Sequence, residues 1–253
     1  MAQAVSESDF EQFLDILRRF TREKLIPAEK EVDETGEIPT EILQQMRDLG
    51  LFGMTLPLKY GGLALSMAQQ VRATFEFTQA SAVFRARFST TLGLASQAVL
   101  FNGSPEQCAT YLPKMASGDM TASFALTEPG AGSDAGGITT HTSRDGGDYI
   151  INGEKCFITN APEADLFVVM ARSDPDSTGA SGISAFLVEA GTPGLTIGRT
   201  DRKMGQHGSH TSNMFFDDCR IPASALLGPE EGQGFKNAMA GINTARMHVA
   251  ATC

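Results

Sequence analysis

The uneven distribution of glycine constrains the fold of this chain more than any other feature. Of the 26 glycines, only eight precede Met120 and eighteen follow it. Glycine destabilises a helix interior by about 1 kcal/mol relative to alanine, whereas turns between strands need its freedom at positive φ. The distribution therefore predicts a change from helices to strands near residue 120.

Residues 1–120 carry the signals of an N-terminal α-helical domain. Ser8 and Glu11 form a capping-box pattern at the start of an apolar run with helical spacing. A second helix is predicted between Pro39 and Gly50, because proline favours the first turn of a helix and glycine its end. A third is predicted to begin at Ser104-Pro105-Glu106-Gln107, with proline at the first helical position and a capping return from the Gln107 side chain.

Residues 121–232 are predicted to form a compact antiparallel β barrel or sandwich. Short runs of β-forming residues follow one another in this region, at 121–127, 149–151, 156–159, 166–171 and 183–188. Gly146-Gly147 and Asn152-Gly153 are predicted as hairpin turns, because two-residue turns need positive φ at their central positions.

Residues 233–253 return to helical spacing and are predicted to start a further helical domain. A single helix cannot bury its apolar face without another element to pack against. The predicted fold class is therefore α+β, with an all-α domain, a β domain and the first helix of a second helical bundle.

The charge and the apolar runs exclude several classes of protein. The net charge of −10 disfavours nucleic acid as the main partner, because phosphate binding needs clustered Lys and Arg. No apolar run approaches the roughly 18 residues of a membrane span, and the acidic start Ser6-Glu7-Ser8-Asp9 is unlike a targeting peptide. A cytoplasmic protein without membrane association is expected.

No metal site is predicted from the cysteines and histidines. The four cysteines are far apart and lack a C-x-x-C pattern, so they are expected to be ordinary thiols. His207 and His210 are three residues apart, but without a nearby cysteine or a helical pattern they are interpreted as loop residues.

The segment Thr127–Gly137 has the composition of a loop that brings bare backbone against a ligand. It holds four glycines, and Thr127 and Ser133 offer hydroxyl groups. Successive glycine N–H groups can face a phosphate, although an ordinary turn has a similar composition. The dinucleotide fingerprint G-x-G-x-x-G does not fit, because the third glycine comes one position late and β-branched residues follow. A nucleotide bound here must be held outside that fold.

Several segments in order resemble the acyl-CoA dehydrogenase family. They include Phe124–Asp134, Ile151–Asn160, Ala171–Asp174, the block from Met204 to Pro222, and Gly232–Arg246. The resemblance implies FAD as cofactor, an acyl-CoA thioester oxidised to its trans-2-enoyl form, and an electron-transfer flavoprotein as electron acceptor. It also implies a homotetramer or homodimer of the complete enzyme.

The resemblance also assigns roles to individual residues. Those implied to contact FAD are Phe124, Leu126, Thr127, Gly132, Ser133, Phe157, Ile158 and Thr159. Those implied to contact the acyl-CoA are Ser133, Asn243 and Arg246. Asn243 stands where many relatives carry an aspartate, so that contact is expected to be altered.

No catalytic base is predicted within the chain. The resemblance implies that most relatives place a glutamate late in a C-terminal helical domain that is largely absent here, and that a minority place it at the position of Ala245. Glu128 is expected to fix the loop by hydrogen bonds. The 253-residue chain alone is therefore expected to be poorly active. Two alternatives stay open: a flavin monooxygenase or oxidase on the same scaffold, and a noncatalytic or split subunit that pairs with a separate C-terminal domain.

Overall fold

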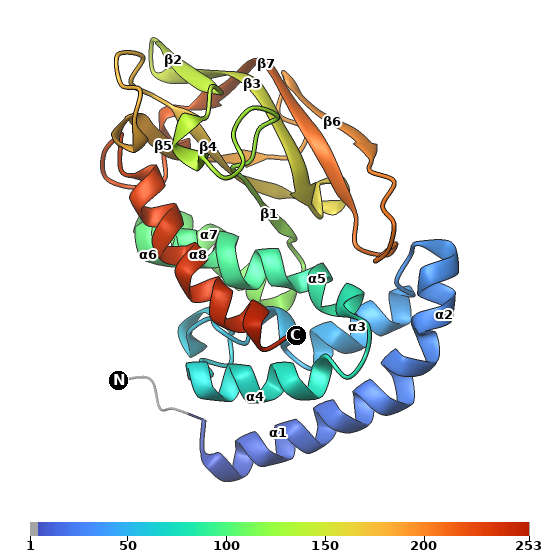
Figure 1. Ribbon diagram of the computed structural model, residues 1–253. Coiled ribbons are helices and arrows are strands. Elements are labelled where there is room, and N and C mark those ends of the chain that lie inside the picture. The colour runs from blue at the N-terminus through green and yellow to red at the C-terminus, as the bar shows by residue number, and fades with distance from the viewer. Residues whose placement is uncertain (1–4, 253) are drawn as a thin grey trace.

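The computed structural model describes residues 5–252, except for the side chains at 244 and 248. Helices occupy one half of the molecule and a curled sheet the other, and the last helix runs from the edge of the sheet across the helical half (Figure 1). The predicted α+β class is confirmed, since helices precede the sheet and a helix follows it.

Seven α-helices come before the first strand in the described part of the chain. They are α1 (Glu7–Phe20), α2 (Ile26–Thr35), α3 (Thr40–Asp48), α4 (Met67–Phe77), α5 (Ala82–Thr90), α6 (Ser96–Asn102) and α7 (Pro105–Ser117). The capping box predicted at Ser104 is present, with both reciprocal hydrogen bonds. The one predicted at Ser8 is wrong: Ser6 caps α1 by accepting from the Asp9 N–H, and Ser8 lies in the first turn.

Two five-residue π-turns join helices that the sequence pattern did not connect. The first, η1 (Thr21–Leu25), links α1 to α2, and the second, η4 (Thr91–Ala95), links α5 to α6. A π-turn leaves backbone carbonyls without their usual helical donors. The Leu92 carbonyl of η4 instead accepts from three side chains, those of Thr55, Ser96 and Gln97.

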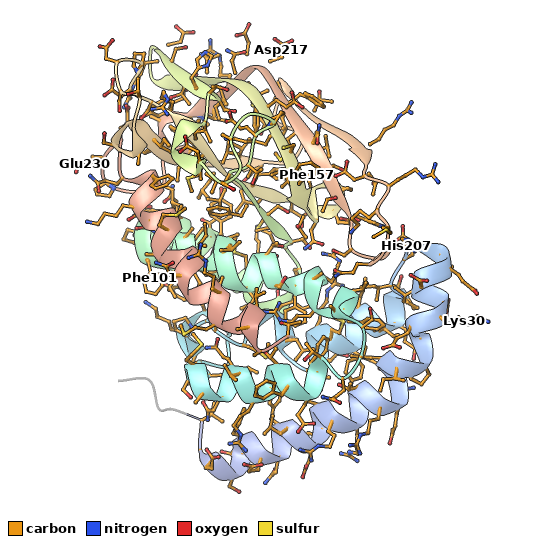
Figure 2. All side chains as sticks on the ribbon, in the orientation of Figure 1. Lys30, Phe101, Phe157, His207, Asp217 and Glu230 are labelled. Carbon is orange, nitrogen blue, oxygen red and sulfur yellow. The ribbon has the colours of Figure 1, made fainter. Side chains whose placement is uncertain are left out.

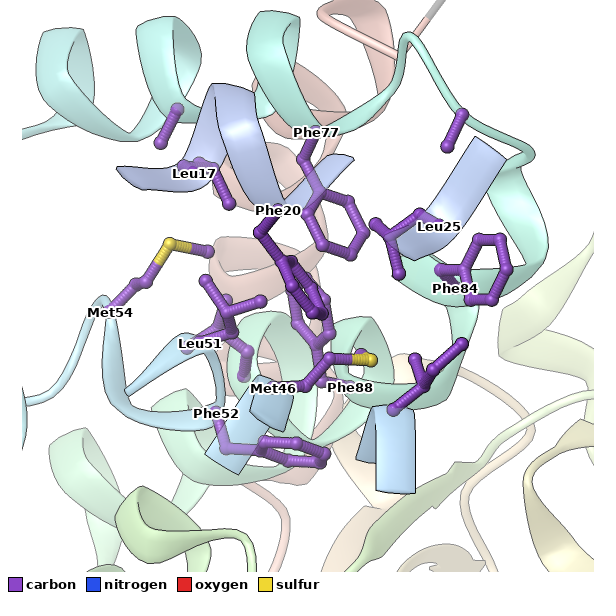
Figure 3. Packing of buried hydrophobic residues seen from close by; sticks show 14 of the residues in the cluster. Leu17, Phe20, Leu25, Met46, Leu51, Phe52, Met54, Phe77, Phe84 and Phe88 are labelled. Atoms are coloured by element: carbon purple, nitrogen blue, oxygen red, sulfur yellow. The ribbon is translucent and has the colours of Figure 1, made fainter. Parts of the chain in front are cut away.

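The helical half has its own aromatic core (Figure 3). Phe88 lies at its centre, with ring centroids 5.8 Å from Phe52 and 5.4 Å from Phe77. Such tilted and edge-on pairs stabilise a core beyond the apolar area that they bury. The apolar stripe of α1 packs onto this core through Leu17 and Phe20.

The sheet has seven strands in the order β1-β4-β2-β3-β7-β6, with β5 paired to β4. Their bounds are β1 (Ala122–Ala125), β2 (His141–Asp145), β3 (Asp148–Thr159), β4 (Leu166–Arg172), β5 (Ile183–Glu189), β6 (Leu195–Thr200) and β7 (Thr211–Pro222). Gly146-Gly147 makes the predicted turn between β2 and β3. Two pairings, β1 with β4 and β2 with β4, run parallel and depart from the purely antiparallel expectation.

Asn152-Gly153 is not a hairpin turn but an irregularity inside β3. The strand continues through it and pairs with β7 on both sides, with a register shift between Ile151 and Gly153. A Cβ at Gly153 would lie 2.6 Å from the Thr140 hydroxyl, so only glycine fits. The Asn152 side chain bonds across the sheet to Asp218, donating to its carboxylate and accepting from its N–H group.

The last helix, α8 (Gly234–Ala250), begins directly against β5 and then passes α6 and η4 (Figure 1). A Cβ at Gly234 would lie 2.4 Å from the backbone carbon of Ser184, so glycine is required for this close approach. The helix thereby connects the edge of the sheet with the helical half. No helix in the described part of the chain is long and apolar enough to span a membrane.

Candidate functional site

The glycine-rich segment Thr127–Gly137 forms the connection between β1 and β2. Its start is closed by a pair of backbone hydrogen bonds between Glu128 and Ala131. Gly132 and Ser133 are exposed, and a Cβ built at Gly132 would have no neighbour within 4 Å. The loop therefore presents open backbone to the surroundings, as its composition predicted.

A buried ion pair holds the start of this loop. The Glu128 carboxylate lies 2.7 Å from the Lys155 ammonium, and the two side chains are 4% and 0% exposed. Glu128 also accepts from the N–H groups of Thr139 and Thr140, and Lys155 donates to the Leu126 carbonyl. The pair thus joins both ends of the loop to the middle of β3, in the structural role expected for Glu128.

The ion pair keeps Glu128 in its charged form. Burial alone would raise the pKa of Glu128, but the Lys155 ammonium and the hydrogen bonds from Thr139 and Thr140 outweigh it and lower the pKa to about 2. Burial lowers the pKa of Lys155, and its attraction to Glu128 only partly offsets that change. A carboxylate so strongly stabilised as an anion is a poor proton acceptor near neutral pH.

Arg172 at the end of β4 holds the other end of the loop. Its guanidinium donates to the carbonyls of Gly136 and Ile138, and also to those of Ser177 and Gly179 in the connection between β4 and β5. With Glu128 and Arg172 at its two ends, the loop is fixed by charged side chains that satisfy its backbone groups.

The segment 156–159 lies beside the start of the loop. The Cys156 N–H donates to the Thr127 carbonyl, and the Ser123 hydroxyl donates to the Thr159 carbonyl. Phe157 has a left-handed backbone with φ of 58° and is 69% exposed, and Figure 2 labels it on β3. A non-glycine residue at positive φ is uncommon, and here it turns an aromatic ring out of the sheet.

Two threonine hydroxyls in these segments have no protein partner. Within residues 5–252, neither the Thr127 hydroxyl nor the Thr159 hydroxyl makes a hydrogen bond. Both side chains are half-buried. Phe124 and Leu126 are half-buried next to them, and Ile158 is buried in the sheet core. The structure therefore brings the residues predicted to contact FAD onto two adjoining segments.

Three hollows follow one another along α8. The loop groove, of about 430 Å³, lies between residues 133–137 and the first turns of the helix at Phe235 and Met239. The α6–α8 cavity, of about 340 Å³, follows at Asn237–Gly241, and Phe124 forms part of its wall. The α5–α8 cavity, of about 90 Å³, lies at Ala245 and Val249.

The α6–α8 cavity is mainly apolar. Its lining consists of Leu94, Gln97, Ala98, Phe101, Asn102, Phe124, Asn237, Ala238, Ala240 and Gly241. Phe101 is 75% exposed and lies beside α8 in Figure 2. An apolar hollow with a few amide groups fits the general character of a small-molecule site.

Asn243 and Arg246, predicted to contact substrate, lie on the exposed side of α8. The Arg246 guanidinium donates to the Asn243 side-chain oxygen over 3.0 Å. Neither residue is among those that line the three hollows. The structure thus brings these two residues together, but it does not bring them to Ser133.

The two spaced histidines, His207 and His210, contact the end of α2. The His207 ring bonds to the Asp33 carbonyl, and the His210 ring bonds to Glu163 and to the Gly36 carbonyl. Figure 2 shows His207 at the upper end of α2. In the part of the chain that the structure describes, no group of three or more His, Cys, Asp or Glu side chains could hold a metal ion.

Lys155 and Arg172 are site residues whose roles were not predicted from the sequence. Both belonged to segments that carried the family resemblance, but their partners are carbonyls and a carboxylate far along the chain. The available signal was that Lys155 directly precedes the β-forming run 156–159, because a lysine that becomes buried in a sheet needs an ionic partner.

Comparisons with known proteins match most of the chain to one family. Two family models match, the N-terminal domain of acyl-CoA dehydrogenase over residues 7–119 and its middle domain over residues 123–219. The chain is 39% identical over 236 residues to an acyl-CoA dehydrogenase of Bacillus subtilis, with 93% of this chain and 62% of that protein covered.

Two further relatives are similar over most of this chain. It is 42% identical over 221 residues to subunit CarC of the caffeyl-CoA reductase-Etf complex of Acetobacterium woodii, with 87% of this chain and 58% of that protein covered. A solved glutaryl-CoA dehydrogenase of Mycobacterium smegmatis in complex with FADH2 is 33% identical with a TM-score of 0.88, covering 98% of this chain and 62% of that one. The chain spans about three fifths of the length of these relatives.

Proposed function

The chain belongs to the acyl-CoA dehydrogenase family, and from this premise we propose that it binds FAD and an acyl-CoA thioester for α,β-dehydrogenation to the trans-2-enoyl-CoA. One observation carries the proposal. The two segments with free threonine hydroxyls adjoin each other at β1 and β3, and Phe124 at the end of β1 forms a wall of the α6–α8 cavity. A cofactor bound at the segments of Thr127 and Thr159 would therefore meet a thioester bound in the α6–α8 cavity.

The donor set fits the ring of FAD. Thr127 and Thr159 offer unpaired hydroxyls to the polar edge of a flavin, and the exposed Phe157 offers an aromatic face for stacking. Phe124, Leu126 and Ile158 supply apolar surface, and we assign Gly132 and Ser133 to the phosphates. When bound, FAD supplies the acceptor for the two electrons that leave the thioester.

The hollows along α8 support a path for the thioester. We assign the CoA arm to the loop groove, where Ser133 faces Phe235 and Met239 across the opening. The acyl group then extends into the α6–α8 cavity, whose apolar lining excludes water and strengthens hydrogen bonds to the thioester carbonyl. The exposed pair Asn243 and Arg246 lines none of these hollows, so its contact with the acyl-CoA stays a prediction of the family resemblance.

The residue that removes the α proton is proposed to lie outside the lining described above. No carboxylate lines the α6–α8 or α5–α8 cavity within residues 5–252, and Ala245 occupies the latter. Glu128 is excluded by its buried pairing with Lys155. Since a carbon acid needs a positioned base, the chain alone is expected to turn over slowly.

Partners of the complete enzyme are also part of the proposal. One similar protein is a subunit of a reductase complex with Etf, and we propose an electron-transfer flavoprotein as electron acceptor for this chain's enzyme. A homotetramer or homodimer and a cytoplasmic location, with a role in fatty-acid β-oxidation, are proposed on the family resemblance.

The proposal is tested by titrating FAD into the 253-residue chain and following flavin fluorescence. One-to-one binding is expected, and addition of an acyl-CoA should bleach the flavin only slowly. The exposed Thr196→Val variant serves as a control for loss of a threonine hydroxyl. No FAD binding, or affinity unchanged in a Thr127→Val/Thr159→Val double variant, would contradict the assigned site.

The oxidase alternative is separated by product analysis with and without oxygen. A dehydrogenase should form the enoyl thioester equally well in both conditions with an artificial electron acceptor present, and it should release little peroxide. Stoichiometric peroxide that appears only in air would instead support an oxidase on this scaffold.

A further inference from the structure

Both ring nitrogens of His210 face groups that accept hydrogen bonds. Nδ1 bonds to the Glu163 carboxylate in η6 (Ala161–Glu163), and Nε2 lies 2.9 Å from the Gly36 carbonyl at the end of α2. A neutral imidazole has one N–H group and one lone pair, so only the doubly protonated ring donates to both partners. The geometry therefore favours the imidazolium form of His210. We call these two hydrogen bonds the His210 clasp.

The Glu163 carboxylate depends on His210 for its hydrogen bonding. Within residues 5–252, the bond to Nδ1 is the one hydrogen bond that this carboxylate makes, and its Oε2 is buried without a partner. The side chains of His210 and Glu163 are 16% and 29% exposed, so water screens this pair less than a pair on the open surface. Loss of the imidazolium charge would therefore be felt directly by Glu163.

The charged groups around the His210 clasp come from several elements. Arg87 of α5 attracts Glu163 but donates its hydrogen bond to Thr121. The others are Asp33 in α2, Glu37 after α2, Arg47 in α3, Asp165 after η6, and Asp201, Lys203 and His207 in the connection between β6 and β7. Arginine keeps its charge at all ordinary pH values, whereas histidine changes charge between about pH 5 and pH 8.

The connection between β6 and β7, which carries His210, packs directly against the helical half. A Cβ at Gly208 would lie 2.6 Å from Val32 of α2 and 2.8 Å from Val83 of α5, so the backbone there touches both helices. Figure 1 shows this connection reaching the end of α2, and Figure 2 labels His207 there. The His210 clasp thus joins the end of α2 to the sheet at the start of β7.

The backbone of His210 also holds the end of β3, where Thr159 lies. The Asn160 N–H donates to the His210 carbonyl over 2.8 Å. Thr159 pairs with Thr211, the residue after His210, in the register of β3 and β7. The Glu163 N–H donates to the Asn160 carbonyl over 3.1 Å, so the bond from His210 to Glu163 closes a short ring through η6. A shift of His210 would therefore shift Thr159, whose hydroxyl has no partner within residues 5–252.

We propose that His210 is a positioning residue for the flavin. In its doubly protonated form it clasps Glu163 to the end of α2 and holds Thr159 in place for FAD, so that FAD binds more weakly as the pH rises and histidine loses its charge. This inference rests on the proposed function, since it takes Thr159 as a flavin contact. It adds a dependence on pH that the flavin contacts alone do not indicate.

The test measures the dissociation constant of FAD for the full chain at about pH 6 and about pH 8.5, on either side of the range in which histidine changes charge. Flavin fluorescence reports binding, and circular dichroism verifies that the chain is folded at both pH values. FAD should bind about threefold to tenfold more weakly at the higher pH, because a charge-assisted hydrogen bond that holds the site is lost.

The variant His210→Gln should remove this pH dependence, because glutamine carries no charge at either pH. The matched control is His207→Gln in the same connection. His207 also bonds to the end of α2, but it is 42% exposed and its partner Asp33 is 68% exposed, where such a pair contributes little. This control should keep the pH dependence of the unaltered chain.

Two further measurements separate positioning from a general loss of stability. Glu163→Gln should also remove the pH dependence, and at about pH 6 it should add little to the effect of His210→Gln, because each change breaks the same pair. This variant also serves if His210→Gln does not fold. Nitrogen-15 NMR of the unaltered chain without FAD should show both His210 ring nitrogens protonated at pH 6 and one deprotonated at pH 8.5.

The outcomes distinguish this inference from the proposed function. If FAD binds equally at both pH values, if the pH dependence survives in His210→Gln, or if NMR shows a neutral His210 ring at pH 6, the positioning role is wrong while the proposed function stands. If FAD binds at neither pH, both are wrong.

Discussion

Replacing Lys155 by methionine is expected to destabilise the fold by about 3 kcal/mol. Methionine retains most of the side-chain length but removes the ammonium. The Glu128 carboxylate, 4% exposed, then keeps its hydrogen bonds from Thr139 and Thr140 but loses its counter-ion. The Leu126 carbonyl loses its donor as well.

The magnitude follows from the two forms that Glu128 can take in the variant. If it stays charged, an unpaired buried carboxylate costs about 3 to 5 kcal/mol. If it binds a proton, neutralising a group of ordinary pKa 4.5 at pH 7 costs about 3.4 kcal/mol, at about 1.36 kcal/mol for each pH unit. Both routes lead to a loss of about 3 kcal/mol or more, so the estimate does not depend on which form is populated.

The assay is urea unfolding at pH 7 followed by far-ultraviolet circular dichroism. Lys30→Met is the matched control, because Lys30 pairs with Glu34 at 3.8 Å on an exposed surface, where such a pair contributes about 0.5 kcal/mol or less. The double variant Lys155→Met/Glu128→Gln should recover part of the loss, since no unpaired charge remains. A loss below about 1 kcal/mol in Lys155→Met, or full additivity of the two single changes, would refute the reasoning.

Three further predictions concern Glu128, the two threonine hydroxyls and Gly234. Because the pKa of Glu128 is lowered from 4.5 to about 2, charged Glu128 contributes to the free energy of unfolding above pH 4.5, and this contribution is lost as the pH falls toward 2. Acid unfolding monitored by circular dichroism should show this loss of stability in the wild type but not in Lys155→Met/Glu128→Gln. Thr127→Val and Thr159→Val should each weaken FAD binding about 5-fold to 10-fold in fluorescence titrations, with little change in urea stability, because neither hydroxyl has a hydrogen-bond partner among the described residues. Gly234→Ala should lower the free energy of unfolding by about 1 to 3 kcal/mol, measured by urea, because its Cβ would meet the β5 backbone at 2.4 Å.

Local signals in the sequence predicted the features that depend on local chemistry. The capping box at Ser104 and the turn at Gly146-Gly147 each depend on a few adjacent residues, and both are present. The change from helices to strands after residue 120 followed from glycine content, because the same residue is costly in helices and needed in turns.

Features that depend on distant pairing could not be predicted in this way. Asn152-Gly153 suits a hairpin turn and an irregular strand equally, and only the pairing of β3 with β7 on both sides decides between them. Strand β7 itself alternates buried and exposed residues, but Asp217 and Asp218 interrupt its β-forming composition. The role of Lys155 depends on Glu128, 27 residues earlier, and neither residue alone indicates the other.

The single helix α8 lines all three hollows: two overlapping stretches, 235–239 and 237–241, border the first two, and Ala245 with Val249 borders the third. A substitution at Ala245 or Val249 changes the α5–α8 cavity without touching the turn at Phe235 and Met239 that borders the loop groove. Under the proposed function, substitutions near the end of α8 would alter the space for the acyl group and leave the turn beside the proposed CoA site unchanged. Because the two regions lie on separate turns of one helix, each can change in evolution without the other.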